Sequence, residues 1–236
     1  MGNGKLYLIP SEIAPDTSLL TVSQQTVLAI RDCNYFLVEN IRTARRYISS
    51  LKLDIVIESL NFEVLDKKTK KQDLKELLKP VYLGSNVGVL SEAGCPGVAD
   101  PGSMAVEYAH QNNIQVVPLV GPSSILLALM GSGFNGQSFA FHGYLPIDKK
   151  ARISAIKKLE KDAAKLDQTQ IFMDTPYRNQ HLLDDLMSNC SNHALLSIAR
   201  DITGENELIK TLTISQWKKE KIDLHKVPVI FSLYAH

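Results

Sequence analysis

The chain has 236 residues, of which 44% are hydrophobic and 22% are charged, a composition typical of a globular protein with one large or two compact domains. Its formal net charge of +1 argues against a dominant electrostatic attraction to nucleic acid, although local basic clusters are not excluded. The cysteines, Cys33, Cys95 and Cys190, are widely spaced without a second Cys or His at ligand spacing, so we expect neither a disulfide framework nor a metal site. With no signal-peptide pattern and no unbroken apolar stretch of membrane length, we expect a cytoplasmic protein.

The first half of the chain alternates between strand-like and helix-like segments. Short apolar runs that predict buried strands occupy residues 5–9, 35–38, 86–90 and 115–119. Segments with helical spacing cover 22–31, 44–51 and 104–111, and a charged connector at 67–71 leads to a short helix near 74–78. This alternation predicts an α/β domain with a mostly parallel sheet and helices on both faces.

The second half has a different pattern. Predicted strands occupy 139–141, 170–173, 194–199, 207–213 and 227–233. Predicted helices cover 125–130, with Gly131 as the C-cap, then 149–166, 178–187 and a short segment around Trp217. Because the last three strands follow one another with little helix between them, we expect them to pair antiparallel in a mixed sheet. We place the domain boundary near Val120, which gives an N-terminal domain of 1–119 and a C-terminal domain of 120–236.

Two loops carry an unusual density of glycine and proline. The loop at 91–102 follows a buried strand, contains three glycines and two prolines, and leads into a helix with Asp100 as the predicted N-cap. The loop at 120–124 repeats the arrangement before the helix at 125–130. Glycine allows close backbone approach and proline limits backbone freedom, so two such stiff loops indicate a small-molecule site more than tight connections alone.

Individual residues of these loops have competing interpretations. N-capping alone would explain Asp100, whereas Glu92 ends a buried strand, where ligands of open α/β sheets lie, and either a salt bridge or a function would explain it. Ser123 could cap the next helix, whose N-terminus could also bind a carboxylate or phosphate. The G-x-G-x-x-G match at 131–136 follows a helix and precedes a strand, the reverse of the dinucleotide fingerprint, so we interpret it as a helix end and loop.

Five motifs in consistent order over residues 5–210 resemble those of the tetrapyrrole methylase superfamily, the class III methyltransferases that use S-adenosylmethionine (SAM). They are SEAGCPGVADPG at 91–102, VPLVGPSS at 117–124, FHGYLP at 141–146, DTPYR at 174–178 and ARDIT at 199–203. Within that superfamily they are most similar to the subgroup of small-subunit ribosomal RNA cytidine 2′-O-methyltransferases.

The chain departs from this subgroup mainly in its N-terminal half. Residues 10–16, PSEIAPD, replace its P-x-P-I-G-N, and residues 38–44 keep Glu39 and Arg42 of its acidic motif but lose the aspartate. Its H-x-x-N-E segment has no counterpart around 61–71, and its terminal K-G-E reads Lys226-Val227-Pro228. The motifs that correspond to the cofactor site are intact while those of the substrate side have drifted, so the resemblance implies SAM more directly than it implies ribosomal RNA.

The resemblance implies a two-domain fold with a cofactor cleft between the domains, a homodimer, and SAM contacts made mostly through backbone groups. Carried over by motif, the cofactor-binding residues would be Pro10, Gly94, Cys95, Pro96, Val98, Gly121, Pro122, Ser123, Ser124, Ile125, Met173, Ala199 and Pro228.

Methyl transfer by in-line displacement depends on alignment and needs no metal or covalent nucleophile. A base that takes the proton of a ribose hydroxyl could be Glu39, Glu92 or Asp100. Arg200 could position a reacting group or only pair with a carboxylate, and Tyr177, which replaces the subgroup's histidine, makes an acid–base role there doubtful. For phosphate contacts the candidates are Arg42, Arg45, Lys149, Lys150 and Arg152, and solvated helix faces explain them equally well.

Three functions therefore remain open. The first is SAM-dependent methylation of a ribose 2′-hydroxyl in ribosomal RNA. The second keeps the fold and the cofactor but changes the acceptor to a tetrapyrrole, another small molecule or a protein side chain. The third is a protein that binds SAM or RNA without catalysis.

Overall fold

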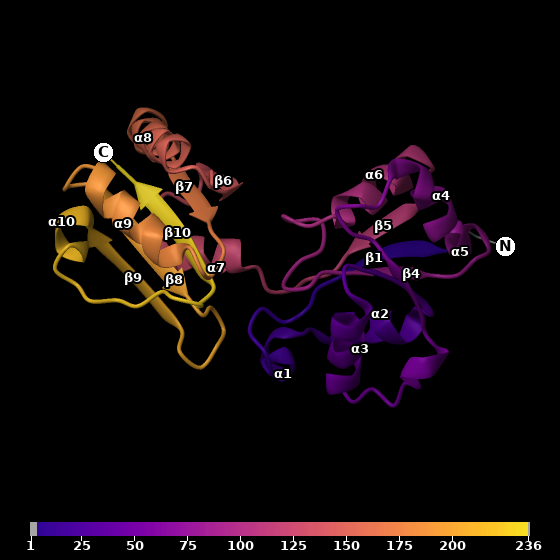
Figure 1. The fold of residues 1–236 in the computed structure, drawn as a ribbon. Coiled ribbons are helices and arrows are strands. Elements are labelled where there is room, and N and C mark those ends of the chain that lie inside the picture. Colours follow the sequence, from indigo (N-terminus) through magenta and orange to yellow (C-terminus); the bar gives the residue numbers. More distant parts are fainter. Residues whose placement is uncertain (1–3, 236) are drawn as a thin grey trace. The chain divides into compact units, whose positions relative to one another are not determined.

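The computed structural model describes residues 4–235, which form two compact units that divide between Ser123 and Ser124 (Figure 1). The sequence placed this division a few residues earlier. Within residues 4–235, no helix combines the length and the apolarity needed to cross a membrane.

Unit 1 is built on a sheet of five parallel strands in the order β3-β2-β4-β1-β5. Its strands are β1 (Lys5–Ile9), β2 (Tyr35–Val38), β3 (Asn61–Val64), β4 (Val87–Leu90) and β5 (Gln115–Pro118). The predicted parallel sheet is therefore confirmed. β3 is absent from the prediction because this four-residue edge strand is largely exposed and has no continuous apolar run.

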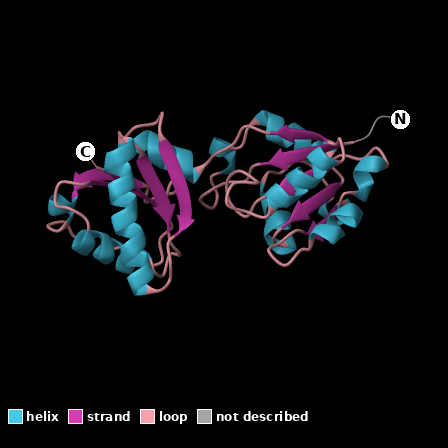
Figure 2. Cartoon of the chain, turned by 90° about the horizontal axis from the view of Figure 1, so that it is seen from above, coloured by secondary structure: helices cyan, strands magenta, loops and turns pink. Residues whose placement is uncertain are grey.

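Helices cover both faces of this sheet, as the two views show (Figures 1 and 2). They are α1 (Ser18–Thr21), α2 (Gln24–Asp32), α3 (Ile41–Ser50), α4 (Leu74–Leu77), α5 (Lys79–Tyr82) and α6 (Gly102–Gln111), with short 3₁₀ turns η1 (Ile57–Ser59) and η2 (Lys71–Asp73). Successive strand residues enter opposite cores: Phe36 and Val38 pack with α2 and α3, whereas Leu37 packs with α4, α5 and α6. This two-sided burial explains the continuous apolar runs of β2 and β4.

Unit 2 has a mixed sheet in the order β6-β7-β10-β8-β9. Its strands are β6 (Phe139–Tyr144), β7 (Thr169–Met173), β8 (Leu195–Arg200), β9 (Leu208–Thr213) and β10 (Val229–Tyr234). β6 and β7 are parallel, while β10 pairs antiparallel with both β7 and β8, and β8 with β9. The expected antiparallel pairing of the last three strands is confirmed.

The helices of unit 2 are α7 (Ser124–Ser132), α8 (Lys149–Leu166), α9 (Asn179–Asn189) and α10 (Ile214–Trp217). α7 packs against β8, β9 and β10, while α8, α9 and α10 cover a core centred on Phe172, Phe231 and Trp217. The predicted C-cap role of Gly131 is wrong, because Gly131 lies inside α7, where a Cβ would come within 2.8 Å of Ile209. The left-handed residue after the helix is Gly133, with φ 77°.

Candidate functional site

Three turns of unit 1 meet at the carboxyl ends of its parallel strands. The N–H of Ser11, in the turn after β1, donates to the carbonyl of Gly94 at 3.0 Å. The Cys95 thiol donates to the Pro122 carbonyl at 3.3 Å. Gly121 lies so close to Pro10 that a Cβ built on Gly121 would be 2.1 Å from the Pro10 Cβ. The structure therefore brings together Pro10 and the two loops that the sequence singled out.

The geometry of the 91–102 loop depends on backbone conformations that favour glycine. Gly94 and Gly97 have φ values of 76° and 82°. The Asp100 carboxylate accepts hydrogen bonds from the N–H of Gly97 at 2.6 Å and of Gly102 at 2.8 Å. Asp100 thus ties the loop to the start of α6, but the N-cap position itself is held by Pro101, which corrects the predicted cap by one residue. Both bonds go to one oxygen, so this carboxylate has a structural explanation.

The remaining residues predicted to bind the cofactor fall into two groups. Most surround the same turns of unit 1, and of these Pro96 is buried while Val98 is 49% exposed. Ser124 and Ile125 begin α7, Met173 ends β7, Ala199 is buried in β8, and Pro228 is exposed just before β10. This second group belongs to unit 2.

Arg200 also belongs to unit 2, at the end of β8, whereas the three carboxylates predicted beside it as catalytic residues belong to unit 1. Its guanidinium donates to the Asp223 carbonyl at 3.2 Å, and its buried Nε has no hydrogen-bond partner among the described residues. Arg200 lines a cavity of about 290 Å³ together with Lys226 and Pro228. Within residues 4–235 it forms no ion pair, so the interpretation of Arg200 as a mere salt-bridge partner is not supported.

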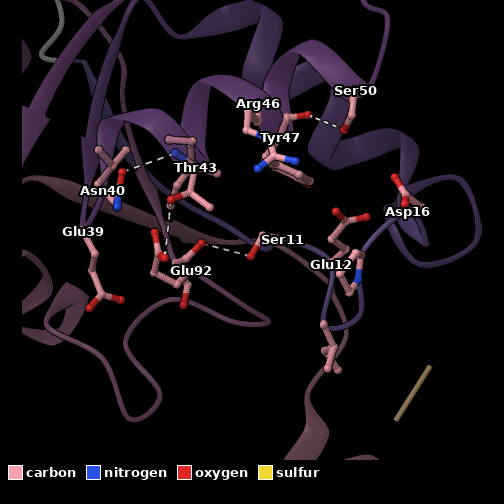
Figure 3. A pocket seen from close by; sticks show the side chains of 16 residues that line it. Ser11, Glu12, Asp16, Glu39, Asn40, Thr43, Arg46, Tyr47, Ser50 and Glu92 are labelled. Atoms are coloured by element: carbon pink, nitrogen blue, oxygen red, sulfur yellow. Dashed lines mark hydrogen bonds between the residues drawn. The ribbon is translucent and has the colours of Figure 1, made fainter. Parts of the chain in front are cut away.

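A second cavity, of about 270 Å³, lies wholly within unit 1 at the ends of β1, β2 and β4 (Figure 3). Four carboxylates line it, those of Glu12, Asp16, Glu39 and Glu92, together with the guanidinium of Arg46. We name it the carboxylate pocket. The turn after β1 is fixed beside it, because the Tyr47 hydroxyl donates to the Pro10 carbonyl at 2.8 Å and the Ser11 hydroxyl donates to the Ser91 carbonyl at 3.0 Å.

Glu39 and Glu92 lie close together in this pocket (Figure 3). Partial burial, together with the negative charges of Asp100 and Glu92, raises the pKa of Glu39, while a hydrogen bond from the Glu92 N–H and the charge of Lys67 oppose the rise. Glu92 is more exposed, and in the part of the chain that the structure describes its carboxylate accepts only a long hydrogen bond of 3.5 Å, from the Thr43 hydroxyl.

Sequence reasoning found Glu39 and Glu92 but missed Glu12, Asp16 and Tyr47, and it considered Arg46 only as a phosphate contact. The parallel register of β1, β2 and β4 brings these residues beside Glu92. The available signal was positional, since residues just after parallel strands converge at one edge of a sheet.

The residues predicted to contact phosphates differ in how exposed they are. Arg42 and Arg45 are exposed on α3, and the Arg45 guanidinium lies 5.3 Å from the centre of the Phe62 ring. Lys149 and Lys150 are exposed in the first turn of α8.

Arg152 is different, because it is buried and bound by protein groups. Its Nη2 pairs with the Asp185 carboxylate at 2.7 Å and its Nη1 donates to the carbonyls of Pro146 and Ile147. This geometry contradicts the predicted phosphate contact of Arg152, which instead fixes the segment before α8 to α9.

Comparison with known proteins adds to the motifs and the fold. No protein-family model matches the chain. It is 28% identical to ribosomal RNA small subunit methyltransferase I of Buchnera aphidicola (subspecies Schizaphis graminum), over 94% of this chain and 75% of that protein. It is 26% identical to the protein of the same name from Vibrio cholerae, over 98% and 77% of the two chains, and 25% identical to that of Escherichia coli O157:H7, over 99% and 78%.

Solved structures resemble the whole chain. The crystal structure of the methyltransferase CobJ matches with a TM-score of 0.64 at 17% identity, over 98% of this chain and 94% of that one. Uroporphyrin-III-C-methyltransferase from Thermus thermophilus matches with a TM-score of 0.58 at 14% identity and the same coverage, so both show the shared fold. The order of the motifs, the relatives and the fold together make this chain similar to the class III methyltransferases of the tetrapyrrole methylase superfamily.

Proposed function

We propose that this methyltransferase uses SAM to methylate a ribose 2′-hydroxyl of small-subunit ribosomal RNA. The observation that carries the proposal is the meeting of the Pro10, Gly94–Cys95 and Gly121–Pro122 turns in unit 1, in a chain whose relatives are named as ribosomal RNA methyltransferases. A homodimer and a cytoplasmic location, both expected from the sequence, form part of the same proposal.

The chemistry of these turns fits SAM. Glycine and proline leave backbone N–H and C=O groups as the main polar groups, and these suit the amino, carboxylate and adenine groups of a nucleoside cofactor. Gly94, Cys95, Gly121 and Pro122 would hold it in unit 1, with Met173, Ala199 and Pro228 as the predicted contacts from unit 2. SAM would supply a methyl group on a positively charged sulfur.

Exposed basic side chains support an RNA substrate. Arg42 and Arg45 on α3, and Lys149 and Lys150 on α8, are free of ion pairs within residues 4–235 and are available to phosphates. Because the net charge is only +1, these few groups would have to provide most of the attraction to RNA.

Calorimetric titration with SAM tests the cofactor, and no heat at millimolar SAM would exclude both methyltransferase functions. Mapping of ribose methylation in ribosomal RNA from a deletion strain tests the acceptor. If every site stayed modified, ribosomal RNA would be excluded, and transfer of labelled methyl to a tetrapyrrole or protein fraction would favour the second function. Binding of SAM without transfer to any fraction of cell extract would favour a binding protein. Light scattering measures the oligomeric state separately.

A further inference from the structure

The carboxylate pocket has the wrong charge for the phosphate groups of RNA. Four carboxylates, those of Glu12, Asp16, Glu39 and Glu92, face a single guanidinium, that of Arg46. In a confined space such an arrangement repels a phosphate and favours groups that donate hydrogen bonds, such as hydroxyls and amines. The surface that attracts the RNA backbone and the pocket that admits the reacting group are therefore chemically distinct.

The size and place of the pocket suit a sugar-sized group. Its volume of about 270 Å³ lies just below the range of about 300–1,000 Å³ typical of sites that bury whole drug-sized ligands. Its wall includes Ser11, Ser91 and Glu92, which adjoin Pro10 and the 91–102 loop proposed to hold SAM. A group bound here would lie beside the turns proposed to hold the methyl donor.

The carboxylates near this pocket differ in how many hydrogen bonds they already accept from the protein. Glu12 accepts from the Thr17 N–H at 3.0 Å and from the Ser18 hydroxyl, so it holds the turn before α1. Asp100 holds Gly97 and Gly102 through one oxygen. Glu39 is oriented by the single N–H of Glu92 and keeps further acceptor capacity, since a carboxylate can accept about four hydrogen bonds.

Glu39 is also the better placed of the remaining two. It directly follows β2, an interior strand of the sheet, and it is partly buried. Glu92 is exposed, and within residues 4–235 its carboxylate has only the long contact to Thr43. A carboxylate that is fixed by one backbone bond and partly shielded from water is well suited to receive a proton.

Building on the proposed function, we propose that the carboxylate pocket binds the acceptor ribose and that Glu39 takes the proton of its 2′-hydroxyl. As the acceptor oxygen gains the methyl group, the electron pair of the broken carbon–sulfur bond stays on sulfur and the hydroxyl proton moves to the Glu39 carboxylate. Glu39 then returns this proton to water. Atoms and charge balance without a metal or any further reactant.

The first test separates proton transfer from anchoring of the loop. Glu39→Gln keeps an oxygen that accepts the Glu92 N–H but removes the base. We expect SAM affinity and melting temperature close to those of the wild type and a loss of methyl transfer of at least about a hundredfold. The exposed Glu58→Gln serves as the matched control with unchanged turnover. Full turnover of Glu39→Gln would overturn the proposal.

The second test needs neither SAM nor turnover. Nuclear magnetic resonance titrations compare cytidine, 2′-deoxycytidine and cytidine 5′-monophosphate as ligands of the wild type and of Glu39→Gln. We expect cytidine to shift the amide signals of Ser11 and Thr43 and to bind several-fold more tightly than either analogue, with most of this preference lost in Glu39→Gln. Equal binding of cytidine and 2′-deoxycytidine, or no binding of cytidine, would refute the acceptor site. A wild type that prefers cytidine but does not bind SAM would instead refute the proposed function alone.

Discussion

The two units place their irregular and polar features differently. In unit 1 the turns at the ends of the parallel strands are shaped by backbone features, the left-handed Gly94 and Gly97 and the contact between Gly121 and Pro10. Unit 2 contains a buried ion pair, Arg152–Asp185, and a buried bond from the Trp217 indole N–H to the Leu196 carbonyl at 2.8 Å.

Substitutions in the two units should therefore affect different properties, ligand binding in unit 1 and folding stability in unit 2. A substitution in the turns of unit 1 changes the shape of a surface proposed to hold a ligand, whereas a substitution in the buried pair of unit 2 changes the stability of the fold. The cysteines offer a probe of each unit, because burial raises the pKa of Cys33 in unit 1 and of Cys190 in unit 2 to about 12, which slows their reaction with thiol reagents until the surrounding core opens.

The largest effect is expected from Arg152→Met. It leaves the buried Asp185 carboxylate without its partner, and breaking a buried pair in this way costs about 3–5 kcal/mol. The free energy of unfolding should fall by that amount in urea, and Cys190 should become labelled faster while Cys33 stays protected.

Two further variants control this experiment. Lys157→Met changes an exposed lysine of the same helix and should alter stability by no more than about 0.5 kcal/mol. The double variant Arg152→Met with Asp185→Leu should recover most of the loss, because it removes both charges. A double variant as unstable as Arg152→Met would mean that the contacts of Arg152 with the carbonyls of Pro146 and Ile147 matter more than the ion pair.

The next effect is expected from Gly121→Ala. The new Cβ would lie 2.1 Å from the Pro10 Cβ, so the turns must separate, at a cost of about 1–3 kcal/mol. We expect weaker SAM binding in calorimetry and faster labelling of Cys33 than of Cys190, the reverse of the Arg152 result. Gly136→Ala, where the added Cβ meets no atom within 4 Å, is the matched control. Unchanged SAM affinity in Gly121→Ala would separate this turn from the cofactor site.

Local signals predicted the regular elements well. Helix α8 at Lys149–Leu166 and strands β1 and β2 match their predicted bounds, because each has a clear periodicity or an unbroken apolar run. Strand β3 was missed because its place at the sheet edge comes from pairing with β2 and not from its own composition. Gly131 was misassigned for a related reason. Only glycine fits there because a Cβ would collide with Ile209, which lies on a strand distant in the sequence.

The candidate site divides in the same way. The glycines and prolines of the 91–102 and 120–124 loops made these loops predictable, because the backbone conformation of a loop depends on its own residue types. The pocket lining of Glu12 and Arg46 depends on strand register, which no local pattern contains. Arg152 was misinterpreted because it stands in a lysine-rich first turn whose other basic side chains are exposed, whereas its own side chain points inward to Asp185.

A smaller effect is expected on RNA binding from Lys149→Ala combined with Lys150→Ala. Each lost phosphate contact on a single strand should reduce the slope of log affinity against log salt by about 0.7. RNA affinity is measured between about 50 and 200 mM salt. The double variant should bind RNA more weakly than the wild type at low salt, and the two affinities should converge at high salt. The pair Lys157→Ala and Lys158→Ala, exposed on the same helix, controls for a general loss of charge. Equal slopes for the two double variants would show that α8 attracts RNA without a specific contact.

The smallest effect is expected on the pH dependence of stability and concerns Glu39. Its pKa is raised in the folded protein by partial burial and by the charges of Asp100 and Glu92, so the folded state holds this proton more tightly than the unfolded state does. Its contribution to stability is therefore complete below the ordinary carboxyl pKa and is lost as the pH rises through the folded value. Glu39→Gln removes this dependence, so the stability of the variant relative to the wild type should rise as the pH increases through this window. Because the side chain is only partly buried, solvent screens these charges, and the change should be well below that of the other variants. Urea titrations of both proteins at matched pH values measure it, and a relative stability that falls with pH would show that Glu39 is stabilised as an anion, a poor property for a proton acceptor.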